Sequence, residues 1–286
     1  MKVWSNLMKE IKGQKFAGER CLFMGKDLQI EDTVFEDGES PLKESENICL
    51  VNSTFNWKYP LWYSKNISVK SCTFTSTARA GIWYTHGITL KDCDISAPKT
   101  FRRSSQITLE NINMPNALET LWSCRKVSMK DVKAQGDYIC MNCEDMEIDN
   151  FDLVGNYAFD GAKNITIRNS KLMTKDAFWN SENITVINSE IRGEYLGWNS
   201  KNLTLVNCTL ESLQGLCYIE NLVLKNCRLI NTTLAFEYST VDAEIEGGVD
   251  SVLNPSGGRI RADYIGELII EKDKVDPEKI SVICKK

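Results

Sequence analysis

The chain has 286 residues, a formal net charge of −5 and a hydrophobic content of 42%, so it can bury a sizeable core and is not disordered. It contains no apolar run of about 18 residues, which excludes a transmembrane helix. Its acidic balance and scattered lysines argue against a nucleic-acid surface. A single histidine excludes a histidine-rich metal site. We therefore expect neither nucleic acid nor membrane as a partner.

Residues 1–26 precede the regular part of the chain and are expected to form an N-terminal cap and the first coil. The apolar residues of Met1–Lys12 fall on one face of a helix, which predicts a short amphipathic helix. The segment lacks the apolar core and the cleavage site of a signal peptide. The 11 cysteines are odd in number and do not form a short disulfide framework. We therefore predict a cytoplasmic protein with free thiols.

From residue 27 to residue 250 the sequence repeats itself every 19 to 21 residues. The segment Asn183–Ile191 recurs as Asn202–Leu210 and again as Asn221–Leu229. Earlier copies begin at Asp27, Asn47, Asn66, Gly87, Gln106, Lys126, Asp145 and Asn164. Such near-equal spacing indicates a solenoid, in which each repeat contacts only its neighbours.

Each copy has the pattern of two short strands joined by a turn. Its second and fourth residues are apolar, as are its seventh and ninth, which is typical of strands with one buried face. The sixth residue is nearly always polar and usually Asn, which tolerates a left-handed backbone. We expect Asn169, Asn188 and Asn207 to be buried at this turn, each bonded to a neighbouring coil.

A third short strand is predicted upstream of each copy, because the residue five positions before each start is usually apolar. Three strands within about 19 residues leave no room for a helix, which predicts an all-β parallel β-helix of about 11–12 coils with end caps. The consensus of leucine-rich repeats and the six-residue period of left-handed β-helices are both absent. Residues 251–286 lose the period and are predicted to form the C-terminal cap.

The Asn ladder, the Asn-Ile-Thr-hydrophobic consensus and the coil length resemble the right-handed β-helices of the pectin-lyase-like superfamily over about residues 20–250. Within that superfamily the chain is most similar to a bacterial family known only as a domain of unknown function. The resemblance implies a right-handed, single-stranded parallel β-helix with a ligand groove along the first strand of each coil. The catalytic segments of polygalacturonase-like enzymes are absent, so no catalytic residue is carried over.

An aromatic column lies on that predicted first strand, four residues before each repeat start. Five of the chain's 7 tryptophans share it, namely Trp62, Trp83, Trp122, Trp179 and Trp198. Alternation with a buried column points these rings outward, and small residues two positions earlier leave room for a flat ligand. Aromatic faces stack on the apolar faces of sugars, which favours an oligosaccharide or polysaccharide partner. Glu119 and Asp137 are predicted to add charged contacts.

Two other interpretations of the column remain open. The rings form a ladder that stabilises neighbouring coils, or they point into a wider coil. We predict a carbohydrate-recognising β-helix protein, with a glycoside hydrolase or polysaccharide lyase activity undecided. The alternative is a non-enzymatic solenoid that has a structural role or docks another protein.

Charged residues interrupt the column and supply the candidates for catalysis. Asp160 and Asp176 belong to adjacent coils and are candidates for the two carboxylates of a glycoside hydrolase. Arg102 is a candidate base for a lyase, the one case in which a Ca²⁺ ion would be expected. Otherwise we expect no cofactor and no metal site. The plainer alternative is that these are ordinary solvated surface charges.

The remaining reactive side chains fit the repeat without a catalytic role. Cys140 and Cys143 have Cys-x-x-Cys spacing, but both fall on repeat columns and are interpreted as core fillers. His86 precedes Gly87 and is interpreted as a turn residue.

Overall fold

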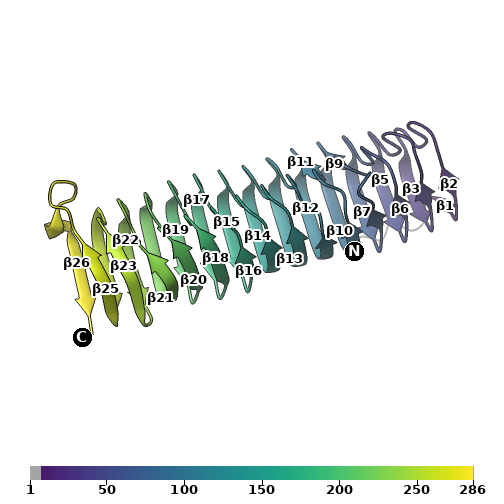
Figure 1. The fold of residues 1–286 in the computed structure, drawn as a ribbon. Helices are drawn as coiled ribbons and strands as arrows, with labels where there is room; N and C mark the ends of the chain where they lie inside the picture. Colours follow the sequence, from purple (N-terminus) through teal and green to yellow (C-terminus); the bar gives the residue numbers. More distant parts are fainter. Residues whose placement is uncertain (1–7, 286) are drawn as a thin grey trace. The chain divides into compact units, whose positions relative to one another are not determined.

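The computed structural model describes residues 8–285, which form two compact units, residues 8–136 and residues 137–285. Each unit is a parallel β-solenoid, and Figure 1 shows its coils stacked strand beside strand. The only helical element among the described residues is the single 3₁₀ turn η1, Pro277–Lys279. No helix in this part of the chain is long and apolar enough to span a bilayer.

The N-terminal unit consists of coils whose strands pair in parallel with the strands one repeat away. Its strands are β1 (Lys9–Lys12), β2 (Lys15–Phe16), β3 (Lys26–Glu31), β4 (Val34–Phe35), β5 (Glu46–Val51), β6 (Thr54–Phe55), β7 (Lys65–Lys70), β8 (Thr73–Phe74), β9 (Ile82–Trp83), β10 (His86–Ile95), β11 (Phe101–Arg102), β12 (Ser105–Met114) and β13 (Arg125–Gln135). Equivalent positions face one another, so that Ile88 pairs with Ile67 on one side and with Ile107 on the other.

The C-terminal unit repeats the same arrangement. Its strands are β14 (Glu144–Val154), β15 (Lys163–Arg168), β16 (Lys171–Met173), β17 (Glu182–Ile187), β18 (Glu190–Glu194), β19 (Lys201–Val206), β20 (Thr209–Leu213), β21 (Glu220–Thr233), β22 (Thr240–Ile245), β23 (Gly248–Leu253), β24 (Gly257–Ala262), β25 (Tyr264–Ile269) and β26 (Ile280–Cys284). Ile165, Ile184 and Leu203 lie in register across β15, β17 and β19. The predicted repeat starts are therefore confirmed as structural equivalents.

The solenoid strands also occur in both segments that were predicted as ends. Strand β1 pairs in parallel with β3, and β26 pairs in parallel with β24. The described residues form about 15 turns, which is more than the 11–12 predicted. The predicted N-terminal helix is wrong over Lys9–Lys12, because this backbone bonds to β3 as a strand. Its residues 1–7 lie outside the described part of the chain.

The interior of each coil is filled by the predicted apolar columns. In the N-terminal unit the rings of Phe16, Phe35, Phe55 and Phe74 stack with successive centroid separations of 5.7, 4.7 and 4.9 Å. Stacked aromatic rings of this kind bury large apolar areas and fix the register of neighbouring coils. The core thus runs along the axis of each unit.

The Asn turn is confirmed in its backbone but not in its burial. Asn169, Asn188 and Asn207 have φ angles of 52°, 51° and 53°, a left-handed conformation that Asn tolerates better than most residues. All three side chains are exposed, so the prediction of buried amides is wrong. They point outward because the left-handed residue sits on the outer side of the bend, and the side chain of Asn207 bonds to Asn188 at 3.0 Å.

A second ladder, which the repeat pattern did not predict, follows the repeat starts. The amide Nδ2 of Asn183 donates to Oδ1 of Asn164 at 2.9 Å. In the same way Asn202 donates to Asn183 at 2.8 Å, and Asn221 donates to Asn202 at 3.0 Å. These residues also have left-handed φ angles. In this part of the C-terminal unit, side-chain amides at both left-handed positions therefore bond to the preceding coil.

Candidate functional site

The tryptophan column lies on a corner that is built mostly from turns. Over residues 59–218, only β9 and β11 are strands at this corner, so the prediction of a third strand in every coil is wrong. Leu121, Phe159 and Phe178 have left-handed φ angles of 58°, 63° and 63°, which interrupts an extended chain. The side chains at this position are nevertheless buried, as predicted.

The small residues next to the column do not line an open groove. Thr100, Thr120, Ala158 and Ala177 have relative exposures of 0%. The turns at this corner break the strict alternation of a strand, so two successive positions face the interior. The expectation that these residues leave room for a flat ligand is therefore wrong.

In the N-terminal unit the column forms a continuous stack. The rings of Trp62 and Trp83 lie 5.2 Å apart with an interplanar angle of 9°. The guanidinium carbon of Arg102 lies 4.6 Å from the Trp83 ring centroid and 4.5 Å from that of Trp122. All four side chains are partly exposed. The stacking occupies both faces of Trp83, so this part of the column matches the stabilising ladder.

The charges predicted near this stack are bound to one another. The carboxylate of Glu119 lies 3.1 Å from Lys99 Nζ and 3.5 Å from an Arg102 nitrogen. Arg102 Nε is buried and has no hydrogen-bond partner. Since the guanidinium lies between two indole rings and beside a carboxylate, its position is that of a structural cation rather than a free base.

In the C-terminal unit the same column has a different geometry. The rings of Trp179 and Trp198 are 6.2 Å apart and tilted by 36°, and Tyr157 meets Trp179 edge-on at 6.5 Å and 83°. The indole N–H of Trp179 donates to the carbonyl oxygen of Tyr195 at 2.8 Å, which fixes the ring. In the adjacent coil the column position is Asp160, whose short side chain cannot cover an indole face.

The predicted carboxylates of this unit have separate partners. Asp160 accepts from the amide of Asn180 at 3.0 Å, and Asp137 accepts from the backbone N–H of Asn156 at 2.7 Å. Asp176 is 3% exposed, and its Oδ1 has no hydrogen-bond partner. Among the hydrogen bonds and ion pairs of residues 8–285, none joins Asp160 to Asp176.

Burial raises the pKa of Asp176 above its ordinary value, and the ammonium group of Lys175 opposes that rise. Lys175 itself pairs with Glu194 at 3.0 Å. Asp176 is therefore a carboxyl group that binds a proton at a higher pH than an ordinary aspartate and is nearly closed to solvent. Arg102 belongs to the N-terminal unit.

The remaining candidate residues of the sequence analysis do not form a metal centre within residues 8–285. No group of three or more His, Cys, Asp or Glu side chains in residues 8–285 is placed to hold a metal ion. Cys140 and Cys143 are both buried, and neither takes part in a disulfide. His86 is exposed at the start of β10, where its Nδ1 lies 2.9 Å from Ser105 Oγ.

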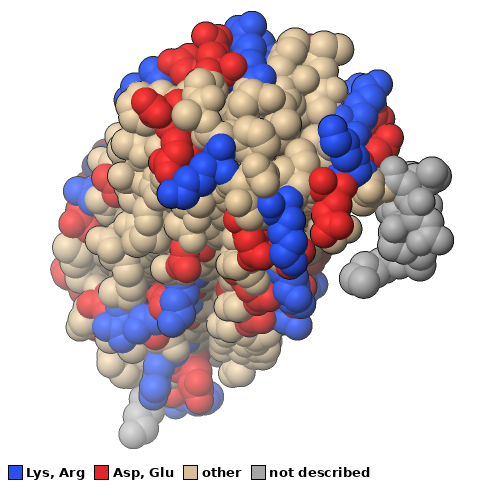
Figure 2. Space-filling model, turned by 90° about the vertical axis from the view of Figure 1, so that its right-hand side faces the viewer, with Lys and Arg blue, Asp and Glu red and all other residues tan. Residues whose placement is uncertain are grey.

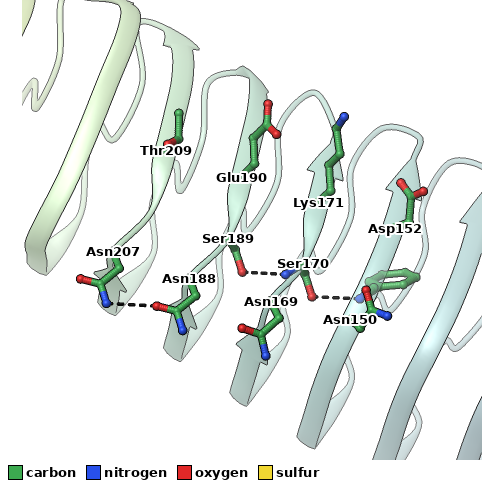
Figure 3. Close-up of a pocket in the computed structure, with 11 residues that line it drawn as sticks. Asn150, Asp152, Asn169, Ser170, Lys171, Asn188, Ser189, Glu190, Asn207 and Thr209 are labelled. Atoms are coloured by element: carbon green, nitrogen blue, oxygen red, sulfur yellow. Dashed lines mark hydrogen bonds between the residues drawn. The ribbon is translucent and has the colours of Figure 1, made fainter.

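A shallow groove of about 650 Å³ lies in the C-terminal unit beside the Asn turn, away from the tryptophan column (Figure 3). Asn150, Asn169, Asn188 and Asn207 form one rim, and Asp152, Lys171, Glu190 and Thr209 form the other. The repeat pattern had predicted only a structural role for these Asn residues. Lys171 is the one basic side chain on the second rim, and it was not singled out from the sequence.

Outside this groove, the surface charges mostly pair between coils. On the face that Figure 2 shows, basic and acidic side chains lie beside one another rather than in patches of one sign. Examples are Lys91–Glu110 at 2.7 Å and Lys201–Glu220 at 3.0 Å. Exposed pairs of this kind contribute at most about 1 kcal/mol each.

Comparison with known proteins identifies the fold class of the chain and the family to which it belongs. The class is the parallel β-solenoid, and the chain belongs to the family described as "Protein of unknown function (DUF3737)", whose model matches residues 9–283. No curated protein matches the chain.

Several solved structures are similar to the chain at low sequence identity and with TM-scores below 0.5. A mutant tailspike protein of E. coli bacteriophage HK620 in complex with a hexasaccharide is 12% identical, with a TM-score of 0.47 over 90% of this chain and 61% of that one. PfbA, a surface adhesin of Streptococcus pneumoniae, is 12% identical, with a TM-score of 0.38 over 87% and 70%. The catalytic domain of a GH87 alpha-1,3-glucanase in complex with tetrasaccharides is 8% identical, with a TM-score of 0.36 over 97% and 64%.

Proposed function

We propose that the C-terminal unit recognises an oligosaccharide at Trp179. The observation that carries the proposal is the change in stacking along the column. Trp83 has a partner on each face, whereas Trp179 has a tilted ring on one side and the short Asp160 in the adjacent coil on the other. Within residues 8–285, the only other ring in contact with Trp179 is Tyr157, which meets it edge-on.

An indole face flanked by hydrogen-bonding groups has the chemistry that a sugar requires. The apolar face of a pyranose packs on the ring, and its hydroxyls donate to Asp160 and accept from Asn180. The hydrogen bond from Trp179 to the Tyr195 carbonyl holds the ring in place before binding, which lowers the entropy lost on association. Trp198 and the other rings of the unit then act mainly as support.

Recognition without hydrolysis is favoured over catalysis. A general acid must come within hydrogen-bond reach of the glycosidic oxygen, and Asp176 is only 3% exposed. Asp160 is the accessible member of the pair and is bonded to Asn180. The catalytic roles of Asp160, Asp176 and Arg102 remain predictions. The expectations that the protein uses no cofactor and is cytoplasmic also remain predictions.

The test is binding of a panel of oligosaccharides to the full chain and to matched variants. Trp179→Ala should weaken binding by about 1–2 kcal/mol, or about 5- to 30-fold in Kd, with a smaller fall in melting temperature than Trp83→Ala, because Trp179 has a stacking partner on one face only. The control Trp83→Ala should lower the melting temperature and leave Kd unchanged. Release of reducing ends by the parent protein, lost in Asp160→Asn, would replace recognition by hydrolysis.

The alternative of a structural or protein-docking solenoid is supported by the N-terminal unit alone. Its continuous stack of Trp62, Trp83, Arg102 and Trp122 accounts for the aromatic residues there without any ligand. If no sugar in the panel binds, this interpretation extends to the whole column.

A further inference from the structure

We propose a second binding site in the groove of Figure 3, which holds a neutral, polyhydroxylated chain, a linear oligosaccharide, along the stacking direction of the coils. The groove is separate from Trp179, because the strands β15, β17 and β19 lie between the two positions in each coil. The inference therefore stands on different residues from the proposed function and does not depend on it.

The first observation is an interruption in the Asn ladder. Asn226 donates to Asn207 and Asn207 donates to Asn188, each at 3.0 Å. Asn169 donates instead to Asp149 at 2.7 Å. Among the described hydrogen bonds, none uses Nδ2 of Asn188 or Oδ1 of Asn169, and Figure 3 shows these two amides as neighbours on one rim. One donor and one acceptor are thus free in adjacent coils.

The second observation is an unpaired cation on the opposite rim. Lys171 lies in register between Asp152 and Glu190, yet no ion pair of Lys171 occurs in residues 8–285. Glu190 pairs with Arg192 instead. Elsewhere in this unit, lysines on adjacent coils reach their acidic neighbours, as Lys163 does with Glu182 at 3.2 Å. The ammonium group of Lys171 therefore remains available as a donor across the groove from the free amides.

The third observation is that the floor between the rims is rigid. Ser170 and Ser189 are 5% and 6% exposed, and their hydroxyls accept the backbone N–H groups of Phe151 and Ser170, each at 3.0 Å. Each hydroxyl also donates to a carbonyl oxygen of its own coil. With the floor satisfied, the backbone positions from which the rim side chains project are held at fixed spacing, which favours binding.

The chemistry and spacing favour a neutral sugar chain. The rims offer amides, a hydroxyl, one ammonium and two carboxylates, a mixture that suits hydroxyl groups. Parallel coils repeat about every 4.8 Å, which is close to the length of one sugar unit in an extended chain. A nucleic acid would need several cations, and a peptide adding to a sheet would need an open strand edge along the groove.

The test is calorimetric titration of the full chain with neutral linear oligosaccharides of two to eight units. Because the groove spans four coils, affinity should increase with length up to about four units and then level off. Asn169→Gly/Asn188→Gly keeps the left-handed backbone and should weaken Kd about tenfold, as should Lys171→Ala. The matched control Asn183→Gly/Asn202→Gly removes the same type of amide from the other ladder and should leave Kd unchanged.

Four results would overturn the groove site. The first is no saturable binding of any oligosaccharide in the series, and the second is an affinity that does not level off with length. The third is an equal loss of affinity in the two Asn→Gly pairs. The fourth is loss of all binding in Trp179→Ala while Asn169→Gly/Asn188→Gly binds as the parent does. The last of these would leave the Trp179 proposal intact. If only the groove variants lose binding, the result supports the groove site and counts against the Trp179 site. The two proposals can therefore be refuted independently.

Discussion

The position of Arg102 between Trp83 and Trp122 predicts a measurable coupling between the cation and each ring. The perturbation is Arg102→Met combined with Trp122→Leu in a double-mutant cycle. Methionine keeps an apolar chain of similar length but removes the charge. Leucine keeps an apolar side chain but removes the ring. The cycle therefore isolates the interaction between the two side chains.

The expected magnitude follows from the burial of Arg102. A cation over an indole contributes about 0.5–1 kcal/mol at exposed sites and about 2 kcal/mol when desolvated. Arg102 has a side-chain exposure of 23%, and its Cζ lies 4.5 Å from the Trp122 centroid. We expect a coupling of about 1 kcal/mol for this ring. The pair with Glu119 at 3.5 Å is present with or without Trp122 and cancels in the cycle.

The assay is urea unfolding of the four proteins, with free energies taken by linear extrapolation. A control cycle of Arg102→Met with Phe35→Leu joins residues of distant coils and should show coupling within about 0.3–0.5 kcal/mol of zero. A coupling for Arg102 and Trp122 that falls in the same range would refute the stack as a source of stability.

Three further predictions concern the turn, the thiols and the buried carboxyl group. Asn188→Ala should destabilise the protein by about 1 kcal/mol more than Asn188→Gly, because a left-handed φ strains alanine; equal urea midpoints would contradict this. Burial raises the pKa of the Cys72 thiol to about 12, so at about pH 8 a thiol reagent should label exposed Cys284 and leave Cys72 unmodified in peptide mass spectra; rapid labelling of Cys72 would count against its burial. Burial raises the pKa of Asp176 above its ordinary 3.8, so its stabilising contribution is complete below that value and is lost as pH rises through the raised pKa. Asp176→Asn should therefore melt at a higher temperature than the parent at neutral pH and at the same temperature at about pH 3, and a lower melting temperature at neutral pH would show the reasoning to be wrong.

The register of the coils could be predicted from sequence because it depends on short-range periodicity. Pairs such as Ile184 and Leu203 occupy the same place in the repeat, and a slip of one residue would turn every buried side chain outward. The Asn turns were predictable for the same reason. Their exposure was not, because the repeat position shows where a left-handed residue falls but not on which side of the bend its side chain lies.

The candidate site was predicted less well, because the tryptophan corner does not follow strand alternation. Thr100 and Ala177 fall inside because left-handed residues break the period of two. The arrangement of Arg102 between two indoles depends on which coil carries which side chain. The groove depends on a gap in hydrogen bonding between Asn169 and Asn188, and two residues of the same type at the same repeat position carry no trace of that gap.

The most direct test of the account is the oligosaccharide affinity of Trp179→Ala measured beside that of Trp83→Ala. The sugar selected on the parent protein should bind Trp179→Ala about 5- to 30-fold more weakly, and the melting temperature of Trp179→Ala should fall less than that of Trp83→Ala. Trp83→Ala should melt earlier and bind that sugar as the parent does. Equal affinity of the parent and Trp179→Ala, with a large fall in the melting temperature of Trp179→Ala, would show that Trp179 is packing and contradict carbohydrate recognition at this site.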